Sequence, residues 1–103
     1  MSIHLTPLEV AECLIAPIGD LGAIVGYQEK SAYHWRRKSS YRDAGDMPPR
    51  INRRLLAHAA KAKRPLTPEH LIWGAPYGDI EALLRAEGRA MPAHLRPQRV
   101  AAE

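Results

Sequence analysis

The 103-residue chain has no phenylalanine, a single cysteine and no long apolar run. One thiol, Cys13, cannot close an internal disulfide, which excludes a disulfide-stapled secreted scaffold and fits a reducing compartment. No segment approaches the roughly 18 consecutive apolar residues that span a bilayer, so we expect no membrane association. The N-terminus also lacks the basic start and apolar stretch of a secretory signal. These absences predict a cytoplasmic protein.

Patterns typical of catalysis and metal binding are missing as well. The five histidines show no ligand spacing, and one cysteine cannot supply a zinc finger. The chain has no glycine-rich phosphate loop, no nucleophile elbow and no paired carboxylates. We therefore expect a protein that is not an enzyme, that uses no metal or cofactor and that has no evident small-molecule effector.

Positive charge is present, and it is unevenly distributed. The chain carries 15 Lys and Arg against 11 Asp and Glu. Residues 26–65 hold eleven basic and three acidic residues, a net charge of +8, whereas residues 1–25 have −3 and residues 66–103 have −1. A polyanion would therefore meet the middle of the chain. The alternative interpretation of a basic stretch is a solvated helix face.

Helix start and stop signals divide the chain into short helices. Thr6-Pro7-Leu8-Glu9 is a capping box with proline at the first helical position, and it predicts a helix that ends near Ala16. Further helices are expected over 20–25, 29–38, from Pro48-Pro49 through Ala62, 67–73 and 80–87, the last capped by Asp79 and ended by Gly88. Residues 39–46 are expected to form a loop and residues 89–103 a flexible, basic, proline-containing tail. No segment alternates with a period of two, so the predicted fold is all-α: a compact bundle of five to six short helices in one domain, residues 1–88.

Residues 18–37, IGDLGAIVGYQEKSAYHWRR, have the pattern of a helix-turn-helix. This motif needs a small residue where its helices cross and a turn residue that tolerates a left-handed backbone. Gly22 or Ala23 can serve the crossing, and Gly26 the turn. The apolar positions between the two helices are filled by Leu21, Val25, Tyr27, Ala32 and Trp35. The spacing therefore predicts a bent pair of helices.

On these residues the chain resembles the Cro/repressor-type (lambda repressor-like) helix-turn-helix superfamily. Over residues 6–73 it is similar to small bacterial carph-isopro or YdaS-like domains, through Trp35-Arg36-Arg37, Met47-Pro48-Pro49 and Leu66-Thr67-Pro68-Glu69. Two features depart from the family: Ile18 stands where a phosphate-binding Gln is frequent, and the loop 39–46 is longer. The resemblance implies double-stranded DNA binding in a bacterial or phage setting, near the nucleoid, and control of prophage-like or mobile-element genes.

A helix that enters the major groove reads bases with the side chains left on its surface. With Ala32 and Trp35 turned inward, the predicted base-reading residues are Gln28, Glu29, Lys30, Ser31, Tyr33 and His34. Sequence-independent phosphate contacts are predicted for Arg36, Arg37, Lys38, Arg42 and Arg53. The alternative is that the polar residues only solubilise the helix; the motif match favours groove reading.

One such domain contacts half a site, so we expect a homodimer that represses by occupying a palindromic operator and occluding a promoter. The predicted dimer contacts are Trp73, Ile80, Leu83 and Leu84, with core packing as the other interpretation of Trp73. The competing hypothesis is a protein-interaction module, an antitoxin or an RNA-polymerase-binding adaptor, that uses the C-terminal helix 79–87 and the tail. Deletion of residues 89–103 would spare DNA binding under the first hypothesis and abolish the main activity under the second.

Overall fold

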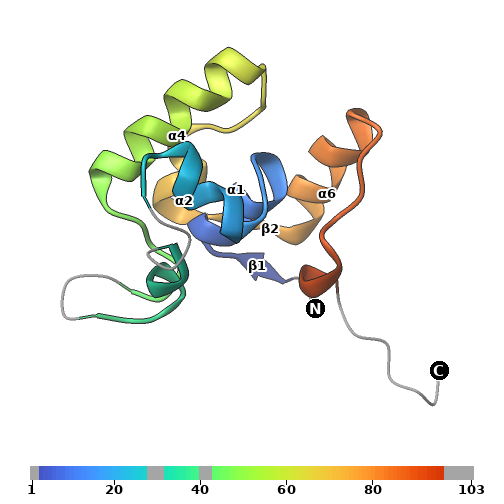
Figure 1. Cartoon of the computed structure of the whole chain (residues 1–103). Helices are drawn as coiled ribbons and strands as arrows, with labels where there is room; N and C mark the ends of the chain where they lie inside the picture. The colour runs from blue at the N-terminus through green and yellow to red at the C-terminus, as the bar shows by residue number, and fades with distance from the viewer. Residues whose placement is uncertain (1–2, 28–31, 40–42, 97–103) are drawn as a thin grey trace.

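The computed structural model of the chain describes residues 3–27, 32–39 and 43–96. In chain order its elements are β1 (His4–Leu5), α1 (Pro7–Leu14), α2 (Ile18–Ile24), η1 (His34–Arg36), α4 (Pro49–Ala62), α5 (Pro68–Trp73), β2 (Ala75–Pro76), α6 (Tyr77–Ala86) and η2 (Ala93–Leu95), where η marks a 3-10 helix (Figure 1). A small, mostly helical and compact domain is thereby confirmed. Within the described ranges, no helix combines the length and apolar character that crossing a bilayer requires.

Helix α1 is the centre of the domain and lies between α4 and α6 (Figure 1). It begins with the predicted capping box: the Thr6 hydroxyl accepts from the Glu9 amide at 3.2 Å, and the Thr6 amide donates to the Glu9 carboxylate at 2.9 Å. Most of its residues are buried, including Leu8, Val10 and Leu14. A helix that is covered on nearly every side requires apolar residues all round, which is what PLEVAECL provides with the exception of its two acids.

A two-stranded antiparallel sheet joins the start of the chain to the segment after α5, and the sequence analysis did not predict it. His4 pairs with Pro76, and Leu5 pairs with Ala75. Gly74, at φ +71°, makes this approach possible, because a Cβ there would lie 1.9 Å from the Leu5 carbonyl oxygen. Strands of two residues have no period to detect in a sequence, which is why the sequence analysis did not find this pair. The domain as a whole remains mostly helical.

Helices α4 and α5 form the side of the domain away from α6. The core face of α4 consists of Ile51, Leu55 and Ala59, all of which are buried. Helix α5 starts with a second capping box, in which the Thr67 hydroxyl accepts from the His70 amide and the His70 Nδ1 accepts from the Thr67 amide at 3.1 Å. A histidine ring therefore fills the position that Glu or Gln takes in the usual capping box.

The C-terminal part differs from the prediction in two ways. Helix α6 begins at Tyr77, so Asp79 lies in its first turn, where a carboxylate is favourable near the helix N-terminus, instead of capping it. The packed domain also continues past residue 88, because Met91 is only 4% exposed and Leu95 packs against the core. Residues 89–96 are thus part of the domain, and residues 97–103 of the predicted tail lie outside the described residues.

Cys13 lies on the buried surface of α1. Burial, with smaller contributions from the negative charges of Glu12 and Glu9, raises the pKa of its thiol to about 12. A thiol with so high a pKa is protonated near neutral pH and is a poor nucleophile. Cys13 therefore acts as a small core residue.

Candidate nucleic-acid interface

The turn after α2 has the left-handed geometry that the motif predicts. Gly26 has φ +86°, the Tyr27 amide donates to the Gly22 carbonyl at 2.7 Å, and the Gly26 amide donates to the Ala23 carbonyl at 3.2 Å. This pair of hydrogen bonds is a Schellman motif, which ends a helix and reverses the chain. Helix α2 itself starts at Ile18, two residues before the predicted start, and Ile18 is buried.

After the turn, the described residues show one buried and one exposed face. Ala32 and Trp35 are 0% and 5% exposed, as predicted for the inner face. Tyr33 and His34 lie on the exposed face. Helical structure ends with η1 at Arg36, so the helix stops two residues before the predicted Lys38. The predicted base-reading residues Gln28, Glu29, Lys30 and Ser31, and the predicted phosphate contact Arg42, lie outside the described residues.

Stacked side chains hold α4 against this turn. The Tyr27 and Trp35 rings meet edge to face, with centroids 6.4 Å apart, and the Arg54 guanidinium lies 6.0 Å from the Tyr27 ring centroid. Arg54 also donates a hydrogen bond to the Val25 carbonyl at the end of α2, where a cation is favoured. Tyr27 was expected between the helices, yet it is 38% exposed, because it covers Trp35 from outside and stacks with Arg54.

Beside this stack, a shallow hollow of about 430 Å³ separates the end of α2 from α4. It is lined by Ile24, Val25, Gly26, Arg54, Ala57, His58 and Lys61. A guanidinium and an ammonium group on one edge of a concave surface are suited to phosphate oxygens. We call this hollow, together with Tyr33, His34 and Arg37, the basic face.

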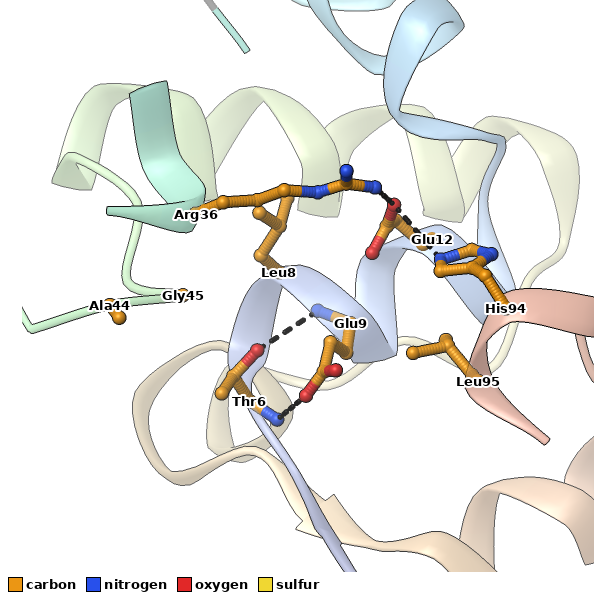
Figure 2. Close-up of a pocket in the computed structure, with 9 residues that line it drawn as sticks. All are labelled: Thr6, Leu8, Glu9, Glu12, Arg36, Ala44, Gly45, His94 and Leu95. Carbon is orange, nitrogen blue, oxygen red and sulfur yellow. Dashed lines mark hydrogen bonds and ion pairs between the residues drawn. The ribbon is translucent and has the colours of Figure 1, made fainter. Parts of the chain in front are cut away.

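Arg36 has a partner within the protein. Its Nη2 donates to the Glu12 Oε1 at 2.8 Å, and the guanidinium carbon lies 5.3 Å from the Tyr33 ring centroid. The Glu12 side chain is 2% exposed, and His94 Nε2 lies 3.4 Å from the same oxygen. Arg36 and His94 approach Glu12 from opposite sides (Figure 2). Arg36 thus neutralises a buried carboxylate, while its contact with phosphate stays a prediction.

The cavity around Glu12 lies between four parts of the domain. It has a volume of about 330 Å³ and is lined by residues of α1 and its capping box, of η1, of the loop before α4 and of η2: Thr6, Leu8, Glu9, Glu12, Arg36, Ala44, Gly45, His94 and Leu95 (Figure 2). Gly45 connects two of these parts, because its amide donates to the Trp35 carbonyl and its carbonyl accepts from the Leu8 amide, both at 2.8 Å. This network fixes the end of the predicted recognition helix to α1.

The other predicted phosphate contacts lie apart from one another. Arg37 and Lys38 are exposed just after η1. Arg53 lies on the other flank of α4 from the basic face, at a hollow shared with α5. The structure brings Arg54 to the turn instead, a residue that the sequence analysis left out of the site. No local pattern identifies Arg54, because its partners Val25 and Tyr27 belong to another part of the chain.

The structure buries some of the predicted dimer contacts and exposes another. Ile80 and Leu84 are 0% and 1% exposed, and Leu83 is half-buried against the core. Their apolar stripe packs within the domain, which removes Ile80 and Leu84 from any surface that a second copy could reach. Trp73, in contrast, is 74% exposed, so core packing does not account for it.

Comparison of the chain with family models, with curated proteins and with solved structures gives no match. The geometry of the basic face is therefore the basis for inferring a function.

Proposed function

We propose that this protein is a sequence-specific, double-stranded DNA-binding transcription regulator that binds through its basic face. More specifically, we propose a repressor of prophage-like or mobile-element genes that occupies a palindromic operator as a dimer and occludes a promoter. The observation that carries the proposal is the Schellman turn at Gly26, followed by a segment that buries Ala32 and Trp35 and exposes Tyr33 and His34.

The electrostatics of the basic face support a polyanionic ligand. Arg54 and Lys61 line one side of the turn, and Arg37 and Lys38 are exposed after the second helical segment. Such cations contact phosphates without regard to sequence and fix the register of a reading helix. Base reading completes the proposed mechanism, in which hydrogen bonds and apolar contacts to base edges select the sequence. The proposed base-reading residues are Gln28, Glu29, Lys30, Ser31, Tyr33 and His34.

Salt-dependent DNA binding tests this proposal. The bound sequence is first identified by genome-wide footprinting, and affinity is then measured by fluorescence anisotropy on that sequence and on random DNA. Arg37→Ala should weaken binding to both and reduce the salt slope by about one. Lys30→Ala should cost about 1–3 kcal/mol on the specific site and relax the preference at one base.

The matched control is Arg85→Ala, because Arg85 is an exposed arginine of α6, remote in sequence from the motif, whose side chain is 77% exposed. It should leave both affinity and salt slope unchanged. The proposal is wrong if wild-type protein ignores duplex DNA at low ionic strength, or if Arg85→Ala and Arg37→Ala reduce binding equally.

The alternative proposal, a protein-interaction module, assigns the activity to the C-terminal helix and tail. Deletion of residues 89–103 is a poor test of it, because Met91 belongs to the core. Removal of residues 97–103 alone leaves Met91 and His94 in place and separates the two functions. If the truncated protein keeps both DNA binding and the main cellular activity, the regulator is supported; if it keeps DNA binding and loses that activity, the module is supported.

A further inference from the structure

An apolar surface lies on the opposite flank of α4 from the hollow of the basic face. Ile72 and Trp73, at the end of α5, are 63% and 74% exposed, the highest values among the large apolar residues that the structure describes. Scattered apolar residues are ordinary on a protein surface, but two consecutive large ones beside a hollow mark an interaction site. Tryptophan is also the residue most enriched at the energetic centre of interfaces.

The hollow next to Ile72 has a volume of about 300 Å³ and is almost wholly apolar. It lies between α4 and α5 and is lined by Pro49, Asn52, Arg53, Leu56, Pro68, Leu71 and Ile72. Its size is at the lower end of the range for cavities that hold a small organic group, which is about 300–1,000 Å³. An aromatic side chain is therefore a suitable occupant.

One polar atom at this hollow lacks a partner. The Asn52 Nδ2 donates to the Met47 carbonyl at 3.4 Å, but the buried Asn52 Oδ1 has no hydrogen-bond partner among the described residues. This oxygen is buried, so the hollow offers an occupant its apolar lining and not a polar contact at Asn52. The indole of tryptophan suits such a lining, because it brings a large apolar surface.

The two charged side chains at this surface, Arg53 and Glu69, have opposite signs, so the surface can pair with another copy of itself. Arg53 is exposed at the rim of the hollow, and Glu69 is exposed one helical turn before Trp73, which places the two on the same side of α5. A partner that inserts a tryptophan flanked by an acidic residue would therefore meet an arginine. A second copy of this chain carries that combination in Glu69 and Trp73.

We propose that this surface, formed by Arg53, Leu56, Glu69, Ile72 and Trp73, docks a second copy of the chain, with each Trp73 in the hollow of its partner. Trp73 and the hollow both belong to α5. A twofold axis can therefore place the Trp73 of each copy in the hollow of the other, which is the geometry of a closed dimer. The inference rests on the dimer of the proposed function and replaces the buried Ile80 and Leu84 as its contacts. The hollow of the basic face, on the other flank of α4, stays accessible.

Sedimentation equilibrium without DNA tests the dimer separately from DNA binding. Wild-type protein should dimerise, and Trp73→Ala should raise the dimer dissociation constant about thirtyfold or more, the loss typical of a central interface tryptophan. Because Trp73 is exposed, its removal should leave the melting temperature of the monomer unchanged. Ile3→Ser, at an apolar residue that is 43% exposed and does not line the hollow, is the matched control and should leave the dissociation constant unchanged.

A charge exchange tests the orientation of the two copies. Arg53→Glu alone and Glu69→Arg alone should each weaken the dimer, and the double variant should recover most of the loss. Tryptophan fluorescence should also shift to shorter wavelength as the concentration rises and the Trp73 indole leaves water, because the other tryptophan, Trp35, is already buried in the monomer.

The inference is overturned if the wild type stays monomeric with an unshifted spectrum, or if Trp73→Ala dimerises as tightly as the wild type. A charge exchange that does not recover dimerisation overturns the proposed orientation. Wild-type protein that stays monomeric and still binds its operator would reject this surface as a dimer contact and leave the proposal of DNA binding intact, so the two proposals fail separately.

Discussion

Arg36→Met should destabilise the protein more than Glu12→Gln, which removes the negative charge that Arg36 neutralises. The Glu12 carboxylate is 2% exposed, with Arg36 at 2.8 Å and His94 at 3.4 Å. Loss of one partner of a buried ion pair costs about 3–5 kcal/mol, because an uncompensated charge stays buried. Since the Arg36 side chain is 44% exposed and His94 remains, we expect about 2 kcal/mol for Arg36→Met, after allowance for solvent screening.

Glu12→Gln should cost about 1 kcal/mol or less, because glutamine has no charge to bury and keeps an oxygen that accepts from Arg36. The double variant Arg36→Met/Glu12→Gln should therefore be more stable than Arg36→Met alone, by about 1 kcal/mol. Such a recovery is the non-additivity expected of two groups in contact.

Urea unfolding followed by far-UV circular dichroism measures these differences. In thermal melts, a loss of about 2 kcal/mol corresponds to a decrease in Tm of about 10 °C for a domain of this size. Arg85→Met is the control, because its ion pair with Glu81 is exposed and should contribute less than about 0.5 kcal/mol. The reasoning is refuted if Glu12→Gln is as damaging as Arg36→Met and the double variant recovers nothing.

Three further predictions concern the backbone and a histidine. Gly26→Val should lower the free energy of unfolding by about 2 kcal/mol or more, because φ is +86° and a β-branched residue is strained there. The control Gly78→Ala, in helix α6 with open space around the added Cβ, should raise it by about 0.5 kcal/mol. Equal melting temperatures of the two variants would contradict this. Lys63→Gly should gain up to about 1 kcal/mol in urea unfolding, because Lys63 holds φ +57°; a loss would show that its side chain stabilises the end of α4. Burial lowers the pKa of His70 from 6.5, and its Nδ1 must be unprotonated to accept from the Thr67 amide. The His70 contribution should be complete above pH 6.5 and lost as the pH falls below it; His70→Gln should remove this part of the dependence of Tm on pH, and an identical profile would reject it.

Several local features could be predicted from the sequence because their causes lie within a few residues. The capping box of Thr6 and Glu9 needs only residues three apart, and the turn at Gly26 needs only a residue without a Cβ. The burial of Ala32 and Trp35 follows from their spacing on one helix face. The double-stranded DNA partner and the operator contacts stay predictions.

The sequence by itself determined most of the short helices, the threonine caps of α1 and α5, the left-handed turn and the concentration of positive charge between residues 26 and 65. Only the tertiary structure decided how these charges are placed, because it pairs Arg36 with the Glu12 carboxylate across 24 residues and brings Arg54 to the end of α2, 29 residues away. It also buried Ile80 and Leu84 while it left Trp73 exposed. The physical reason is that a periodic pattern specifies which residues share a face of a helix, whereas packing against distant segments decides which faces are covered.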